Sequence, residues 1–165
     1  MARPLPDLAG WPALVLTAGL ATRLAPLSSV RAKAALPVAG APLITRLLRW
    51  LHAAGVRRAV LNLHHHAATI TRIVGDGRGL GLEVRYSWED PVLGSAGGPA
   101  RAVPLLDAER FLIVNGDTLT NLNLGALVAR HLDGDALVTM AVAPGDTARY
   151  GGVVTDGRGD VLGFA

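Results

Sequence analysis

A short apolar run that leads straight into a turn of small residues is the feature that most constrains the fold of this chain. The run Ala13–Leu16 is typical of a buried parallel strand. The turn after it, residues 18–23, ends in Arg23, and a second cation, Lys33, follows ten residues later. Small residues let backbone N–H groups approach a ligand, and two cations supply charge for triphosphate oxygens. The segment therefore predicts a site for a nucleotide's phosphates. The alternative is an ordinary strand-to-helix connection with surface Arg and Lys.

Composition indicates one packed domain. A small anionic substrate would account for its few basic residues. The 165 residues are 50% hydrophobic and 18% charged, which favours a globule over disorder. A chain of this length buries roughly 70% of its unfolded surface. The net charge is only +3 and the arginines are scattered, so we expect no nucleic-acid partner. The absence of cysteine excludes disulfides and thiolate metal sites. No apolar run reaches membrane-spanning length and the start lacks the order of a secretory signal. We therefore expect a cytoplasmic protein with no membrane partner.

Strand and helix patterns alternate along the chain, which predicts an α/β fold with a parallel sheet. Strands are expected at 13–17, 58–63, 82–86, 111–114 and 136–142, and helices at 42–54, 67–74, 95–106 and 122–132. Gly55 is expected to end the first of these helices. From residue 150 onward, short strands and glycine turns predict a hairpin.

A carboxylate follows the apolar run of residues 111–114. The run ends in Asn115-Gly116-Asp117, and open α/β sheets bind ligands just beyond the carboxyl ends of their strands. Asp117 could hold Mg²⁺ against phosphate oxygens, which that hard cation prefers. The alternative is a turn in which Asn115 and Asp117 satisfy backbone donors. The presence of Arg23 and Lys33 favours the metal role.

A second glycine-rich segment, residues 89–98, ends in Gly97 and Gly98. Its small residues leave room for a flat base and a ribose against the backbone. The alternative is a helix start capped by Ser95 with loose glycines, and the two can hold together. Glu89 is expected to be a solvated charge rather than a catalytic one.

Two further motifs predict no cofactor site. His64, His65 and His66 follow one another at a strand exit, where consecutive side chains alternate in direction and cannot converge on one zinc ion. The glycines of residues 75–81 miss the G-x-G-x-x-G register of a dinucleotide site and follow a helix rather than a strand.

The segment 13–38 resembles the signature of the sugar-1-phosphate nucleotidylyltransferases, GxGTR(L/M)xPLTxxxPK(P/A)LxPV. The matching positions are Gly19, Thr22, Arg23, Leu24, Pro26, Leu27, Lys33, Leu36, Pro37 and Val38. Ala21 replaces the second glycine, and Ala32 replaces the proline before the lysine. Alanine is strained wherever φ must be positive. Residues 93–97 resemble the family's LGTAG element, and Asp117 matches the metal-binding aspartate of its NGD motif. The NLHHH and SAGGPARAVPLL segments are most similar to the mannose-1-phosphate guanylyltransferase and N-acetylmuramate-1-phosphate uridylyltransferase groups.

The resemblance implies a Rossmann-like, three-layer α/β domain of the GT-A-like type, with a mostly parallel twisted sheet and an incomplete C-terminal part. It implies one nucleotidyltransferase domain over residues 1–165, with the nucleotide-binding part at 1–120 and the start of the sugar-binding part at 121–165. The implied reaction joins an NTP and a sugar 1-phosphate to give a nucleotide-sugar and pyrophosphate, with Mg²⁺ as cofactor. The resemblance thus implies an enzyme of the EC 2.7.7 type, which could form a homo-oligomer.

The resemblance also assigns roles to residues. Arg23 and Lys33 would be catalytic, and Asp117 would bind the metal. The nucleotide-binding candidates are Ala18, Gly19, Leu20, Ala21, Thr22, Gly97 and Gly98. Gly152, in a stretch similar to the family's YG(G/V)V element, would contact the sugar, or would simply bend a strand. A second metal ligand and a lysine for the sugar phosphate are expected from positions after the hairpin.

Two other functions remain open from the sequence. One is a non-catalytic nucleotide-sugar-binding or regulatory subunit of the same fold. The other is a dinucleotide-dependent oxidoreductase, which the missing fingerprint and Arg23 disfavour.

Overall fold

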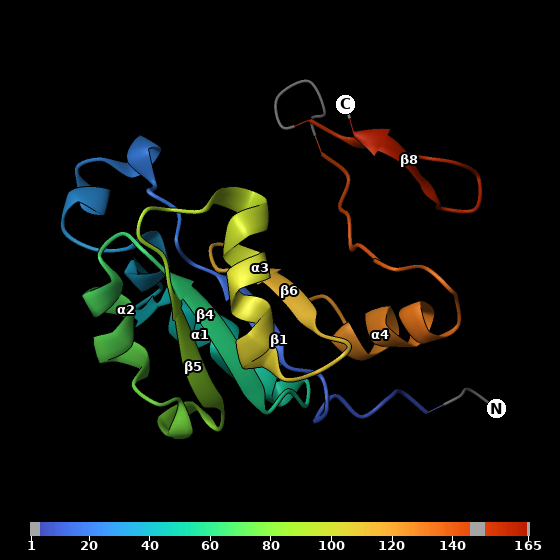
Figure 1. Cartoon of the computed structure of the whole chain (residues 1–165), viewed down its shortest axis with the longest axis horizontal. Helices are drawn as coiled ribbons and strands as arrows, with labels where there is room; N and C mark the ends of the chain where they lie inside the picture. Colours follow the sequence, from blue (N-terminus) through green and yellow to red (C-terminus); the bar gives the residue numbers. More distant parts are fainter. Residues whose placement is uncertain (1–3, 146–150, 165) are drawn as a thin grey trace. The chain divides into compact units, whose positions relative to one another are not determined.

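Four parallel strands form the sheet of the first unit, residues 1–125 (Figure 1). The strands are β1 (Ala13–Leu16), β4 (Arg58–Leu63), β5 (Glu83–Trp88) and β6 (Leu112–Asn115), in the order β5-β4-β1-β6. The computed structural model describes residues 4–145 and 151–164. The predicted α/β fold with a parallel sheet is confirmed.

The carboxyl ends of the strands are level with one another. Leu16 lies opposite Asn62 on one side and Asn115 on the other, and Leu63 lies opposite Trp88. The sheet grows from β1 toward β4 and β5, and then β6 is added on the other side of β1. Such a change of direction leaves a crevice at the carboxyl edge, where the loops after β1 and β6 diverge.

Both faces of the sheet are covered by helices. Leu14 and Val60 pack against Ala102 and Leu106 of α3 (Gly94–Leu106), which Figure 1 shows in front of the sheet. The alternate residues of these strands are buried too, and Figure 1 shows α1 (Leu43–Ala53) behind the sheet. Strands buried on both faces explain the continuous apolar runs in the sequence.

Helix α1 has one apolar face and a glycine stop. Its buried residues are Leu43, Ile44, Leu47, Leu48 and Leu51, which recur at the spacing of one helix face. Gly55 has φ +107°. The Val56 N–H donates to the Leu51 carbonyl at 3.1 Å, and the Gly55 N–H donates to the His52 carbonyl at 3.0 Å. This is the Schellman arrangement that a glycine permits, so the predicted end of the helix is confirmed.

Short elements connect the strands. They are α2 (Ala67–Val74), the antiparallel pair β2 (Pro37–Val38) and β3 (Ala41–Pro42), and the 3₁₀ turns η1 (Thr22–Leu24), η2 (Leu27–Ser29), η3 (Lys33–Ala35) and η4 (Arg78–Leu80). Between β1 and β2 the chain thus forms three single helical turns, each held by few hydrogen bonds of its own.

The second unit, residues 126–165, contains most of α4 (Leu124–Leu132) and an antiparallel hairpin of β7 (Val153–Thr155) and β8 (Val161–Phe164). In the hairpin turn, the Asp156 carboxylate accepts backbone hydrogen bonds from Arg158 and Asp160. These bonds hold the pKa of Asp156 below its ordinary value. The predicted hairpin is confirmed over the described residues.

Apart from one strand, the predicted elements lie within two residues of the observed ones. The strand expected at 136–142 is wrong, because this stretch is irregular and Leu137 is 98% exposed. A strand needs a neighbour to pair its backbone groups, and no described strand pairs with this stretch. Within residues 4–145 and 151–164, no helix is long and apolar enough to cross a membrane.

Candidate functional site

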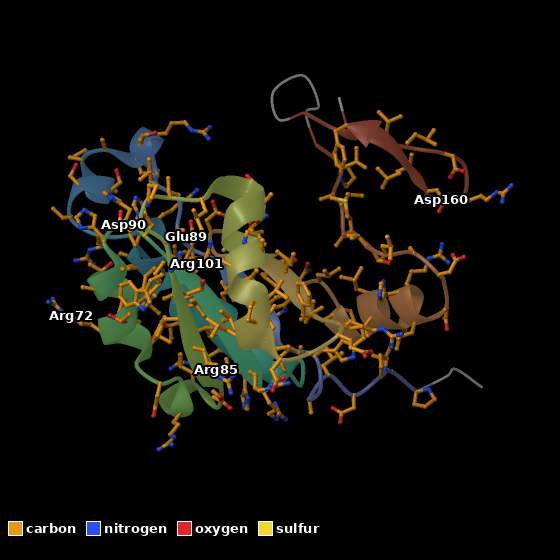
Figure 2. The ribbon with its side chains drawn as sticks, in the orientation of Figure 1. Arg72, Arg85, Glu89, Asp90, Arg101 and Asp160 are labelled. Atoms are coloured by element: carbon orange, nitrogen blue, oxygen red, sulfur yellow. The ribbon has the colours of Figure 1, made fainter. Side chains whose placement is uncertain are left out.

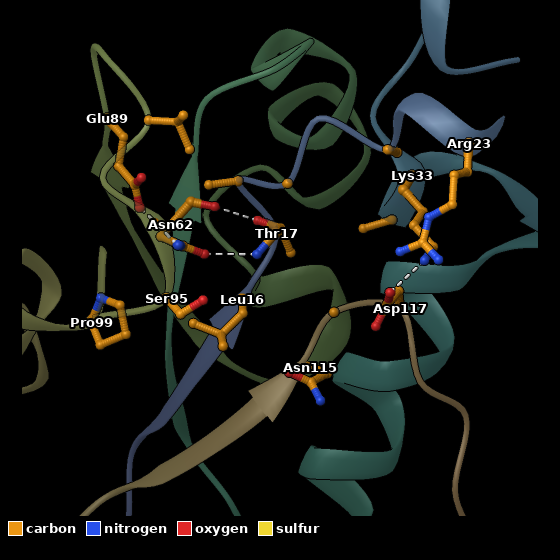
Figure 3. Close-up of a pocket in the computed structure, with 17 residues that line it drawn as sticks. Leu16, Thr17, Arg23, Lys33, Asn62, Glu89, Ser95, Pro99, Asn115 and Asp117 are labelled. Carbon is orange, nitrogen blue, oxygen red and sulfur yellow. Dashed lines mark hydrogen bonds and ion pairs between the residues drawn. The ribbon is translucent and has the colours of Figure 1, made fainter. Parts of the chain in front are cut away.

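A pocket of about 370 Å³ opens at the carboxyl edge of the sheet (Figure 3). Its walls come from the ends of β1, β4 and β6 and from the segments that follow β1, β5 and β6. The volume lies in the range of sites for small molecules. The level strand ends and the reversal of strand order beside β1 put the pocket at the crevice where open α/β sheets bind ligands.

One side of the pocket carries two cations and a half-exposed carboxylate. Arg23, Lys33 and Asp117 all line it, although 84 residues separate the lysine from the aspartate. Lys33 Nζ donates to Asp117 Oδ2 at 2.5 Å, and both side chains are 42% exposed. Figure 3 shows the Arg23 guanidinium on the same side as this pair. A half-exposed ion pair is weak, so a polyanion entering the pocket could compete for the ammonium.

Buried alanines fix the direction of Lys33. The side chains of Ala32, Ala34 and Ala35 are at most 3% exposed, so the η3 turn is packed on its inner side and the lysine is left to face the pocket. The Ala32 N–H donates to Thr69 Oγ1 at 3.1 Å. A proline here, as in the family signature, has no N–H and could not make this bond.

Ala21 occupies a left-handed conformation. Its φ is +51° and its ψ is +37°, a region that costs a residue with a Cβ about 1–2 kcal/mol. Ala21 also lines the pocket. The departure from the family's second glycine therefore falls where glycine would fit the backbone better.

The opposite side of the pocket rests on a buried polar network. The Thr17 N–H donates to Asn62 Oδ1 at 2.7 Å, and Asn62 Nδ2 donates to Glu89 Oε1 at 2.8 Å. The second carboxylate oxygen of Glu89 accepts the Leu93 N–H at 2.8 Å. All three polar side chains belong to residues at most 7% exposed. Figure 2 shows Glu89 near the carboxyl edge of the sheet and Arg85 farther down β5.

The expectation that Glu89 is a solvated charge is wrong. The residue is 4% exposed, and its carboxylate is held by two donors, as a buried charge requires. Asn62 is a polar residue near the end of an apolar strand, but nothing local in the sequence identifies Glu89 as its partner. The alternative in which Ser95 caps α3 is wrong, because the helix begins at Gly94 with Leu93 at the N-cap. Ser95 instead lines the pocket.

Two glycines make room for this site. A Cβ on Gly98 would collide with Glu89 Oε1 and lie 2.9 Å from Asn62 Nδ2. A Cβ on Gly116 would lie 2.5 Å from the Leu16 carbonyl oxygen and 2.6 Å from Thr17 Cγ2. Gly116 thus lets the chain after β6 pass close to the end of β1, and Gly98 lets α3 lie directly against the buried carboxylate.

The structure brings most of the predicted site residues together. Those that line the pocket are Ala18, Gly19, Ala21, Arg23, Lys33 and Asp117. Those that do not line it are Leu20, Thr22, Gly97 and Gly98. Leu20 is 44% exposed, Thr22 begins η1, and the Gly97 position packs against the Leu93 side chain. The sequence analysis missed Thr17, Asn62, Val92, Pro99 and the lining role of Gly116.

Gly152 lies in the second unit, directly before β7. The structure describes Gly151 and Gly152, whereas Tyr150 of the same motif lies outside the described residues. A contact between Gly152 and a sugar stays a prediction.

The fold and the pocket together define an α/β protein with a ligand site at the switch point of a parallel sheet, lined by two cations and two carboxylates. A family model described as "Nucleotidyl transferase" matches residues 12–165. The chain belongs to the nucleotidyl transferase family.

Several relatives are similar over most of this chain. A mannose-1-phosphate guanylyltransferase from Mycobacterium tuberculosis is 37% identical over 153 residues, which are 92% of this chain and 43% of that protein. An N-acetylmuramate alpha-1-phosphate uridylyltransferase from Neisseria meningitidis is 41% identical over 115 residues, which are 69% of this chain and 50% of that protein. The chain thus spans half or less of the length of these relatives.

Solved structures agree with the fold. The crystal structure of HddC from Yersinia pseudotuberculosis matches with 26% sequence identity and a TM-score of 0.78. The match covers 93% of this chain and 68% of the HddC chain. The same protein has been solved in complex with GMP-PN, with a TM-score of 0.77.

Proposed function

We propose that this chain is a sugar-1-phosphate nucleotidylyltransferase, which joins an NTP and a sugar 1-phosphate to give a nucleotide-sugar and pyrophosphate. One observation carries the proposal: two cations and a carboxylate, distant in sequence, line one pocket at the carboxyl edge of the sheet. The relatives named above act on mannose 1-phosphate and N-acetylmuramate α-1-phosphate with guanylyl and uridylyl groups. These are the first substrates to test on this chain.

The chemistry needs no protein nucleophile. A phosphate oxygen of the sugar 1-phosphate attacks the α-phosphorus of the NTP in line, an O–P bond forms, and the bond to the pyrophosphate oxygen breaks. The protein then contributes by positioning the two reactants and by neutralising charge. Arg23 and Lys33 would contact the triphosphate and the leaving pyrophosphate. The loop that contains Gly19, and residues 92–95 at the start of α3, would seat the nucleotide.

Asp117 fits a role as magnesium ligand. Its carboxylate is half-exposed at the pocket, and carboxylate oxygens suit this hard cation. Among the described residues, no three histidine or acidic side chains gather as a metal group. Asp117 would therefore share the ion with phosphate oxygens, as is usual for Mg²⁺. The bound ion would supply neutralisation of phosphate charge, and Lys33 would leave Asp117 for the phosphates.

The test is pyrophosphate release by the 165-residue chain with MgCl₂, a panel of NTPs and a panel of sugar 1-phosphates. We expect release with at least one pair of substrates. Arg23→Ala and Lys33→Ala should each lower the rate by about 100-fold or more with the fold retained, as expected for a lost charge contact in the transition state. Arg31→Ala is the matched control, because Arg31 is exposed in the same segment and does not line the pocket.

Two results would count against the proposed function. An unchanged rate in Arg23→Ala or Lys33→Ala contradicts the roles assigned to those cations. Nucleotide binding without pyrophosphate release from any pair supports instead a nucleotide-sugar-binding or regulatory subunit of the same fold.

A further inference from the structure

The two walls of the pocket are made of chain with little regular structure. The charged wall belongs to the segment 17–35, which contains three single 3₁₀ turns, and we call it the phosphate-side segment. The opposite wall belongs to residues 89–95, between β5 and the first turn of α3, and we call it the nucleoside-side segment. Such segments hold a shape only where something outside them fixes their backbone.

Two adjacent histidines after β4 reach one segment each. His64 Nδ1 lies 2.9 Å from the Glu89 carbonyl oxygen. His65 Nε2 lies 2.8 Å from the Ser28 carbonyl oxygen. A carbonyl oxygen only accepts hydrogen bonds, so His64 must carry its proton on Nδ1 and His65 must carry its proton on Nε2. The two rings thus use different nitrogens to hold opposite walls of the same pocket.

The rest of the β4 exit adds to this arrangement. Asn62 bonds Thr17 on one side and Glu89 on the other. Thr69, at the start of α2, accepts the Ala32 N–H and donates to the His66 carbonyl at 2.7 Å. Ser28 and Ala32 both lie between Arg23 and Lys33 in the chain. The segment 62–69 therefore holds the stretch that carries both cations at two points.

We propose that His64 and His65 are separate positioning residues, His64 for the nucleoside-side segment and His65 for the phosphate-side segment. What the two walls bind rests on the proposed function. The assignment of each histidine to one wall does not depend on that function. Loss of the His65 bond removes one of the two points that hold the stretch between the two cations. Loss of the His64 bond frees the loop that leads into Ser95.

The first experiment is amide hydrogen exchange on the ligand-free chain, which needs no substrate. His65→Ala should raise exchange in residues 27–36 by roughly three- to tenfold and leave residues 89–95 unchanged, as expected for one lost hydrogen bond. His64→Ala should do the reverse. His66→Asn is the control for the ring contact alone. The His66 ring lies against the His65 ring, with centroids 4.2 Å apart, but its side chain makes no hydrogen bond to either wall among the described residues, and asparagine tolerates its φ of +50°.

Conservative variants test which nitrogen is used. The amide nitrogen of asparagine lies near the position of a histidine Nδ1, and that of glutamine near Nε2. His64→Asn and His65→Gln should therefore keep wild-type exchange, whereas His64→Gln and His65→Asn should behave like the alanine variants. These variants also keep the test open if either alanine variant fails to fold.

Ligand binding gives the second readout. By isothermal titration, His65→Ala should weaken Mg-pyrophosphate binding by roughly tenfold, and His64→Ala should leave it within about twofold of wild type. Both should weaken binding of the full NTP. Equal exchange changes in both segments for both alanine variants, or no rescue by His64→Asn and His65→Gln, would overturn the proposal. If wild type binds neither ligand while the exchange pattern holds, the proposed function fails and the positioning roles stand.

Discussion

Replacement of Ala21 by glycine should stabilise this protein, which is unusual for a substitution that removes a methyl group. With φ at +51°, the alanine bears a steric cost of about 1–2 kcal/mol. Glycine removes that cost but has more backbone entropy to lose on folding, about 0.5–1 kcal/mol. The difference predicts that Ala21→Gly raises the free energy of unfolding by about 0.5–1 kcal/mol, or about 1–4 °C in Tm for a chain of this length.

Urea denaturation followed by circular dichroism measures this difference. Ala34→Gly is the matched control, because Ala34 lies in the same segment, is 3% exposed and has no positive φ. That variant should lose about 1–2 kcal/mol through a lost buried methyl and added backbone entropy. Ala39→Gly, with φ +47°, should gain stability as Ala21→Gly does. A loss of more than about 0.5 kcal/mol in Ala21→Gly would refute the strain argument.

Three further predictions follow from single contacts. Lys33→Ala should cost less than about 1 kcal/mol of stability, because the pair with Asp117 is half-exposed, and a loss above about 2 kcal/mol in urea denaturation would contradict this. Ser87→Ala should leave stability unchanged or raise it by up to about 1 kcal/mol, because the buried hydroxyl oxygen of Ser87 has no hydrogen-bond partner among the residues that the structure describes; clear destabilisation in the same assay would mean that the hydroxyl is bonded. Backbone N–H donors lower the pKa of Asp156 in the folded hairpin. The ionised carboxylate therefore stabilises the hairpin at a pH above the pKa that Asp156 has in the unfolded chain, and this stabilisation is lost as the pH falls through the pKa of the folded state. A carboxyl NMR titration should find its midpoint below that of an aspartate in an unfolded peptide, and an equal or higher midpoint would contradict the hydrogen bonds.

The strands and helices of the first unit could be predicted because their patterns are local. Apolar runs with glycine or a turn at each end locate β1, β4 and β6, and Gly55 ends α1 as expected. The stretch 136–142 has a strand's composition but no described partner, and composition alone carries no information on pairing. The signature around Arg23 and Lys33 located the charged wall of the pocket.

The buried network could not be predicted from local pattern. Asn62 and Glu89 are 27 residues apart, and each looks like an ordinary polar residue at a strand end. Their burial depends on α3 lying against them, which in turn requires the missing side chain at Gly98. The same holds for His64 and His65, whose partners on the far walls are set by tertiary structure.

Isothermal titration of Mg-bound GTP and UTP into wild type, Arg23→Ala and Lys33→Ala tests most directly whether this pocket holds a triphosphate. We predict one site per chain, competition by pyrophosphate, and affinity at least about tenfold weaker in each variant, because each removes a charge-assisted contact. Equal affinity in all three proteins would show that the two cations do not meet on one triphosphate, and the account of the pocket would be wrong.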